Sequence, residues 1–220
     1  MQGREQSVSA TIKFAVDRML GAEVTSSTPA GCTVQVLTDD AKEKFDLVLR
    51  RIFRLLPEMF DTYIEGTQSD VDVFRETVNF KHNQIKKFVN YGLRLLNKFG
   101  HEDASKTTFY FAIIDYLGKI DEIMKNMVEY AIKNNKQRIG KKCLAYMKEV
   151  KNAFDSYHAF FYSYDLKKVT EFHKNRDLFK LRNSDAFRTM NQEEVYILAS
   201  FTQIYDILID LSELRMSIGY

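Results

Sequence analysis

The sequence of 220 residues contains few of the residues that interrupt helices, with two prolines and nine glycines. Lysine, glutamate, leucine, isoleucine, phenylalanine and methionine are plentiful, and this combination favours long helices. A chain of this length buries roughly 70% of its unfolded surface, so it can hold a core together without disulfides or metals. We therefore expect an all-α protein of one domain, or of two small domains in contact.

Cysteine is also scarce, and neither sign of charge predominates. Cys32 and Cys143 lie far apart and have no CxxC spacing, which predicts free thiols in a reducing, cytoplasmic compartment. The 32 basic and 30 acidic residues give a formal net charge of +2. Such a balance provides no strong field for nucleic acid, so we expect no nucleic-acid partner.

Long hydrophobic runs are missing. The apolar run at residues 109–114 ends at Asp115, far short of the ~20 apolar residues that a bilayer-spanning helix needs. The first twenty residues carry charges within an amphipathic pattern, unlike the uninterrupted apolar core of a secretory signal. The sequence as given therefore predicts a soluble protein.

Recognisable catalytic motifs are missing as well. We find no glycine-rich phosphate loop, no GxSxG elbow and no ExxH motif repeated on two helices, as di-iron bundles have. The histidines lack the HxxxH or HExxH spacing of zinc hydrolases and are predicted to be surface or packing residues: His82, His101, His158 and His173. We therefore expect no enzymatic activity.

Two long amphipathic stretches stand out among the residues that are present. In residues 109–132 the apolar positions recur at steps of three and four, which predicts one helix face: Ile113, Leu117, Ile120, Met124, Met127 and Ala131. Asp121, Glu122, Lys125 and Glu129 are predicted to lie on the opposite face. Residues 194–218 repeat this design. Two similar helices closing two similar halves suggest a duplicated helical unit.

The N-terminal residues 1–38 differ from the rest and are predicted to be an arm or linker. A short helix is expected within residues 12–20, followed by a turn-rich connector at 25–33 and a short extended segment at 34–37. The first long helix is expected from the capping residues Asp39 and Asp40 to Gly66, with a kink at Pro57.

The remaining helices follow from periodicity and capping signals. A second helix is expected from Ser69 or Asp70 to about Phe99, with Gly100 as its stop. Residues 39–134 then form three antiparallel helices, and the basic segment 134–142 is the best internal boundary. A fourth helix reaches about Tyr164. The fifth is predicted to be shorter and broken, with residues 182–190 irregular. Asn191 and Glu194 form a capping pair before the last helix, so that the second repeat spans about 141–220.

The sequence resembles the PhoU family of phosphate-uptake regulators, including the PhoU-like cytosolic domains of bacterial sodium/phosphate cotransporters. The family's LERIGDxxxNI pattern is similar to LGKIDEIMKNM at residues 117–127 and to FTQIYDILIDL at residues 201–211. The family's EEINxLxxEIxxYLxxL segment is similar to residues 76–93. The resemblance covers roughly residues 39–220 and implies a PhoU-like bundle of two three-helix repeats.

In many PhoU relatives, acids in an ExxxD pair bind metal, because carboxylates at i and i+4 share a helix face. Here Gly118 and Thr202 replace the first acid, while Glu122 and Asp206 retain the second. Asp210 is placed to supplement Asp206. The resemblance thus implies a divalent or iron metal at these three acids, against the alternative of solvated or ion-paired surface residues. Because the paired acids are lost, we expect no obligatory cofactor.

An aromatic run at residues 157–166 suggests a partner surface, since tyrosine combines apolar area with a polar tip. The candidate partner-binding residues are Tyr157, Phe160, Tyr162 and Tyr164. The alternative is that these residues border the core. The basic segment 133–142 is either a solvated linker or a contact with membrane headgroups.

The resemblance implies a regulatory or adaptor domain in phosphate uptake, acting by protein contact on a phosphate transporter or its membrane domain. It is expected in the cytoplasm, either free or at the inner face of the membrane as part of a transporter, and a homodimer is an alternative to the monomer. One alternative is a stand-alone, metal-binding PhoU-type regulator. Another is a helical-bundle enzyme, which would need acids or histidines converging inside the bundle, whereas the sequence puts most of them on polar faces.

Overall fold

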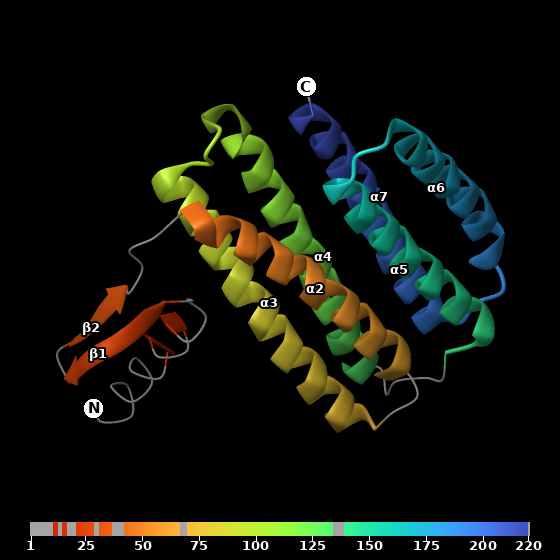
Figure 1. Ribbon diagram of the computed structural model, residues 1–220. Coiled ribbons are helices and arrows are strands. Elements are labelled where there is room, and N and C mark those ends of the chain that lie inside the picture. Colours follow the sequence, from red (N-terminus) through yellow and green to blue (C-terminus); the bar gives the residue numbers. More distant parts are fainter. Residues whose placement is uncertain are drawn as a thin grey trace.

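The computed structural model describes residues 11–12, 15–16, 21–28, 31–36, 42–66, 70–133 and 139–219 (Figure 1). The predicted all-α class is confirmed for these residues, which form a helical bundle with a short strand-containing arm. The helices are α2 (Lys42–Gly66), α3 (Val71–Phe99), α4 (Thr107–Lys133), α5 (Lys141–Tyr162), α6 (Leu166–Ala186) and α7 (Gln192–Ile218), with a short 3₁₀ helix, η1 (Ala104–Lys106).

Several helix ends lie where local chemistry predicts them. The Asp70 side chain accepts hydrogen bonds from the backbone N–H groups of Asp72 and Val73 and so caps α3. Gly100 ends α3 with a φ of 72°, a left-handed conformation that favours glycine. Asn191 and Glu194 form a complete capping box at α7. All three expectations are confirmed. Residues 37–41, which contain the predicted caps Asp39 and Asp40, lie outside the described residues.

Helix α6 corrects the prediction of a broken fifth helix. It runs without interruption from Leu166 to Ala186, through the polar residues 182–185. Phe179 and Ala186 are fully buried on its inner side, and Arg182 forms an ion pair with Glu149 of α5. Tertiary contacts therefore hold together a segment whose own periodicity is weak. Helix α2 also continues through Pro57, and the kink predicted there stays a prediction.

The N-terminal arm contains a β-hairpin that was not predicted. Strands β1 (Ala22–Thr28) and β2 (Gly31–Val36) pair antiparallel, with Ala22 opposite Val36. Residues 25–28 and 31–33, predicted to belong to a turn-rich connector, instead lie within these strands. The extended segment expected at 34–37 is confirmed through Val36. Of the short helix expected within 12–20, the described residues 12, 15 and 16 are helical.

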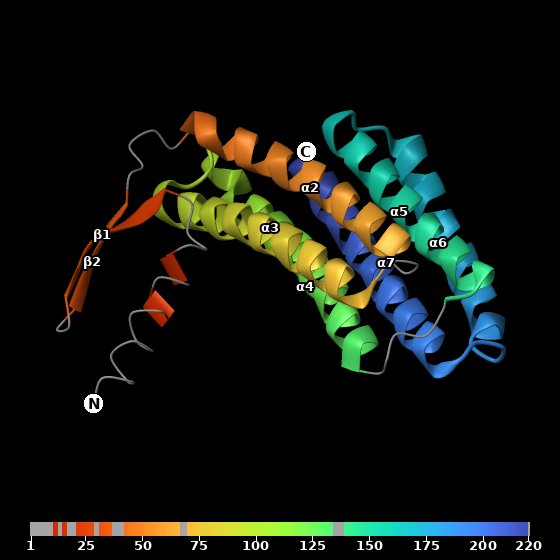
Figure 2. The same cartoon turned by 90° about the horizontal axis from the view of Figure 1, so that it is seen from below.

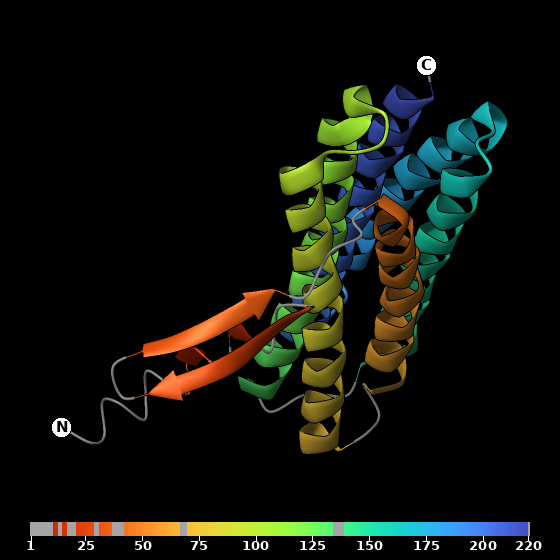
Figure 3. The same ribbon diagram turned by 60° about the vertical axis from the view of Figure 1, so that its left-hand side comes forward.

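The helices form two neighbouring groups. Helix α3 packs against both α2 and α4, while α7 packs against α5 and α6. The groups meet where α4 lies against α7 and α2 against α5, as two views at right angles show (Figures 1 and 2). The hairpin lies outside the bundle, on the side of α3 (Figure 3).

An aromatic core joins the two groups. Phe60 of α2 lies with its ring centroid 5.5 Å from that of Phe154 in α5 and 6.0 Å from that of Phe201 in α7. Phe53 contacts Phe154 and Phe161 in the same way. All of these rings are buried, so side chains from both halves of the sequence share one core.

Helix α7 is, by length and composition, the one described helix able to cross a membrane. However, 56% of its most apolar window is buried within the bundle. The central helix of a bundle needs the same composition, because it is covered by neighbours on several sides.

Candidate functional site

Glu122, one of the predicted metal ligands, lies on α4 beside Lys86 of α3. The two side chains form an ion pair at the half-exposed surface between these helices. Burial alone would raise the pKa of Glu122, but the hydrogen bond and the charge of Lys86 outweigh it and lower the pKa below its ordinary value. The carboxylate is therefore held in its charged form by a cation of the protein itself.

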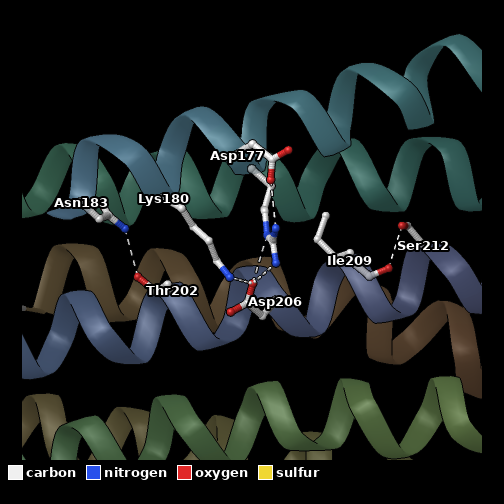
Figure 4. A network of polar contacts seen from close by, with 8 residues as sticks. Asp177, Lys180, Asn183, Thr202, Asp206, Ile209 and Ser212 are labelled. Atoms are coloured by element: carbon white, nitrogen blue, oxygen red, sulfur yellow. Dashed lines mark hydrogen bonds and ion pairs between the residues drawn. The ribbon is translucent and has the colours of Figure 1, made fainter.

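Asp206, the second predicted ligand, lies on α7 and faces α6. Its Oδ1 atom accepts hydrogen bonds from the Arg176 side chain at 3.0 and 3.2 Å and lies 2.7 Å from Nζ of Lys180. Figure 4 shows Lys180 reaching down from α6 to this carboxylate. Arg176 also forms an ion pair with Asp177, with its Nη1 atom 2.9 Å from Oδ1 of that residue. Asp206 is thus surrounded by two cations.

The third predicted ligand, Asp210, is exposed one turn further along α7. Glu122 lies on α4 rather than on α7, and the structure does not bring the three acids together as one set. Among the described residues, no three His, Cys, Asp or Glu side chains are close enough to hold a metal. Lysine and arginine occupy the positions beside Glu122 and Asp206 that a metal would need. Metal binding at these acids stays a prediction.

Gly118 stands where the PhoU pattern has its first acid, and its surroundings leave little room for a side chain. A Cβ atom at this position would lie 3.0 Å from Cγ1 of Val89 on α3. Gly118 is buried, so α3 and α4 approach each other closely here. The loss of the acid therefore goes together with tight helix packing.

Among the described acidic and basic side chains, the two least exposed form a pair that the sequence pattern did not reveal. His82 of α3 and Asp121 of α4 meet with Nδ1 and Oδ2 2.7 Å apart, and their side chains are 3% and 0% exposed. We predicted Asp121 on the polar face of its helix and His82 as a packing or surface residue. Asp121 instead follows Leu117 by four positions, which places it on the buried side.

Asp121 is only partly satisfied by this contact. Its second oxygen, Oδ1, is buried and has no hydrogen-bond partner. Burial raises the pKa of Asp121, and the hydrogen bond and charge of His82 oppose that shift without cancelling it. The pair fixes how α3 and α4 face each other, because any slip of one helix would leave both groups buried and alone.

The other helix group has a comparable contact, between a histidine and a hydroxyl group. His173 of α6 lies with Nε2 2.9 Å from the Ser212 hydroxyl of α7, and that hydroxyl donates to the carbonyl of Ile209 at 2.7 Å. Because the hydroxyl proton is used there, Ser212 accepts from an Nε2–H group. Figure 4 shows the hydrogen bond from Ser212 to Ile209 and, near the other end of the network, the hydrogen bond from Asn183 to Thr202.

The four aromatic residues predicted to bind a partner separate into two pairs. Tyr157 and Phe160 are 0% and 1% exposed and belong to the core, whereas Tyr162 and Tyr164 are 48% and 37% exposed. As folded, the first two offer no surface to a partner, in agreement with the core alternative. The helix period explains the division, since α5 turns one face inward and ends at Tyr162.

Replacing Tyr157 with phenylalanine should stabilise the protein. The Tyr157 hydroxyl is buried without a hydrogen-bond partner, and its removal takes away a desolvated polar group while the ring remains. We expect the free energy of unfolding to rise by about 1 kcal/mol, measured by urea denaturation. Tyr205→Phe is the control for loss of a hydroxyl elsewhere in the core. A clear loss of stability in the Tyr157 variant would show that its hydroxyl has a partner in solution.

Comparison of the chain with protein-family models, curated proteins and solved structures finds no match. The similarity to PhoU thus depends on the short segments quoted above, and it stays a prediction.

Proposed function

We propose that this protein is a non-enzymatic regulatory or adaptor domain in phosphate uptake, in the manner of a PhoU-like domain. In this proposal it is the cytosolic domain of a sodium/phosphate cotransporter and acts through protein–protein contact. The supporting observation is the pairing of helix groups: α4 and α7, the third helix of each group, lie against each other. Two such groups are what a PhoU-like bundle of two repeats requires.

The ion pairs add a second element of symmetry. Glu122 and Asp206 stand at corresponding positions of the resembled pattern, and each is paired with a cation from the middle helix of its own group. This use of the acids supports a role in packing and contact rather than a metal-cluster role. A bundle of this kind regulates by binding a transporter more tightly in one conformation than in another.

The proposal predicts that phosphate uptake changes when the bundle is removed. In the native host, residues 42–219 would be deleted from the gene and uptake of radioactive phosphate measured at low and high external phosphate. We expect uptake to lose its dependence on phosphate supply while the amount of transporter, measured by immunoblot, stays constant. A strain carrying Leu181→Ser, an exposed position on α6, serves as the matched control.

An immunoblot of fractionated cells tests the cotransporter part separately. The proposal predicts a membrane-bound product much larger than the 220-residue chain. A soluble product of the chain's own size contradicts the cotransporter assignment, and unchanged regulation of uptake in the deletion strain contradicts the role in phosphate uptake.

A further inference from the structure

One end of the bundle carries exposed aromatic and aliphatic side chains close to arginines. The turn after α3, the connection from α5 to α6 and the last turn of α7 lie together at this end (Figures 1 and 3). Here Tyr162, Tyr164 and Leu166 are 48%, 37% and 60% exposed. Exposed apolar side chains gathered in this way suggest a contact surface.

Two guanidinium groups flank these tyrosines. Arg50 of α2 lies 5.9 Å from the ring centre of Tyr162, and Arg215 of α7 lies 5.1 Å from that of Tyr164. The Nε of Arg215 also donates to the Phe161 carbonyl at 2.7 Å, which fixes the position of its group. Across the described chain, no carboxylate forms an ion pair with either arginine. Arg215 is thus held in place, and both guanidinium groups have hydrogen-bonding capacity to spare.

The chemistry of this end favours carboxylates presented by a protein. A planar guanidinium binds a carboxylate through two parallel hydrogen bonds, and tyrosine and arginine are the side chains that contribute most at protein interfaces. The surroundings do not form a field of one sign, because Asp46 precedes Arg50 by four positions on α2 and Asp165 follows Tyr164 in the chain. A membrane of anionic lipid needs a cluster of unopposed cations, which this end does not provide.

From this arrangement we propose that Arg50, Tyr162, Tyr164 and Arg215 form a docking surface for an acidic segment of a partner protein. The two arginines bind its carboxylates, and the tyrosine rings together with Leu166 cover its apolar side chains. This inference rests on the proposed function only in requiring a protein partner, and it adds the chemistry by which that partner is recognised.

Photo-crosslinking from within the surface tests the proposal. Benzoylphenylalanine would replace Tyr164 in the full chain expressed in native cells, and the cross-linked segment would be identified by mass spectrometry. We expect a protein segment with at least two acidic residues beside the cross-link. The same probe at Leu181 on α6 is the position control and should not yield that product.

Charge reversal tests the role of the arginines. Arg50→Glu should reduce the Tyr164 cross-link about 10-fold, whereas Arg188→Glu, an equal charge change at the exposed turn before α7, should leave it unchanged. Arg50 is exposed on α2, so its variant should fold, which circular dichroism would verify. Changing the acids of the cross-linked segment to lysine should restore the product with Arg50→Glu.

Three outcomes would overturn the proposal: a cross-linked segment without acids, a cross-link indifferent to Arg50→Glu, or binding to phosphatidylglycerol vesicles that Arg50→Glu abolishes. The last result would assign the surface to a membrane. If the chain with the probe at Tyr164 and no other change gives no acidic cross-link, in cells whose uptake regulation does depend on residues 42–219, the docking surface alone is refuted. An acidic cross-link in cells whose uptake ignores the deletion of residues 42–219 refutes the proposed function alone.

Discussion

Asp121→Ala is expected to lower the free energy of unfolding by about 3 kcal/mol or more. The change leaves the His82 ring buried between α3 and α4 without its partner and opens a small cavity beside it. Urea denaturation followed by circular dichroism measures the effect. Because small proteins are stable by only about 5–15 kcal/mol, a loss of this size would be evident as a lower melting temperature.

Two further variants distinguish the loss of the contact between His82 and Asp121 from the effect of the cavity. Adding His82→Ala to Asp121→Ala should cost less than the sum of the single changes, because the second substitution removes a group already left alone. Asp121→Asn keeps the shape and a hydrogen bond to His82, so it should be close to neutral. Additive losses in the double variant would mean that the two residues do not interact in solution.

The same carboxyl group makes stability depend on pH. Burial raises the pKa of Asp121 above its ordinary value of 3.8, so the folded protein holds this proton more tightly than the unfolded chain does. Its contribution to stability therefore falls as the pH rises from about 3.8 through the folded pKa. Relative to the wild type, Asp121→Asn should become more stable over that rise. A constant difference across the range would contradict the shift.

Gly118→Glu, which restores the first acid of the PhoU pattern, is expected to destabilise the protein by about 3 kcal/mol. Its Cβ atom would meet Cγ1 of Val89 at 3.0 Å, and its carboxylate would be forced into the contact between α3 and α4. Thermal unfolding measures the loss. Exposed Lys119→Glu is the matched control, since it adds an acid one position away without entering the core.

A compensating change tests the steric cause. Val89→Ala removes the methyl groups that meet position 118, so the double variant should recover part of the stability lost by Gly118→Glu. If Gly118→Glu instead folds normally and binds manganese or zinc stoichiometrically, then the helices separate more easily than their packing indicates, and the acids can still act as metal ligands.

The parts of the fold that the sequence predicts are those set by neighbouring residues. Asp70 caps a helix through N–H groups two and three positions away, and Asn191 and Glu194 do the same within one turn. The end of α6 escaped prediction because its stability comes from Glu149 of α5 and from burial of Phe179. The hairpin escaped because its strands are short and their turn residues resemble those of a loop.

In the candidate site, too, contacts between residues distant in the sequence escaped prediction. Periodicity divides a helix into two faces, but it does not identify the partner of a buried acid. Asp121 contacts His82, which lies 39 positions earlier in the chain and on another helix. In the same way, periodicity does not separate Tyr157 from Tyr162, although Tyr157 is fully buried and Tyr162 is half exposed. Partners across helices become visible only in three dimensions.

The aromatic rings shared by α2, α5 and α7 make the two helix groups one folding unit. Separating the two groups would expose Phe60 of one group together with Phe154 and Phe201 of the other. The segment between α4 and α5 therefore marks a boundary in the sequence but not in the energetics, and we expect a single cooperative unfolding transition. We therefore expect a partner bound at one end of the bundle to move both helix groups together as one rigid body.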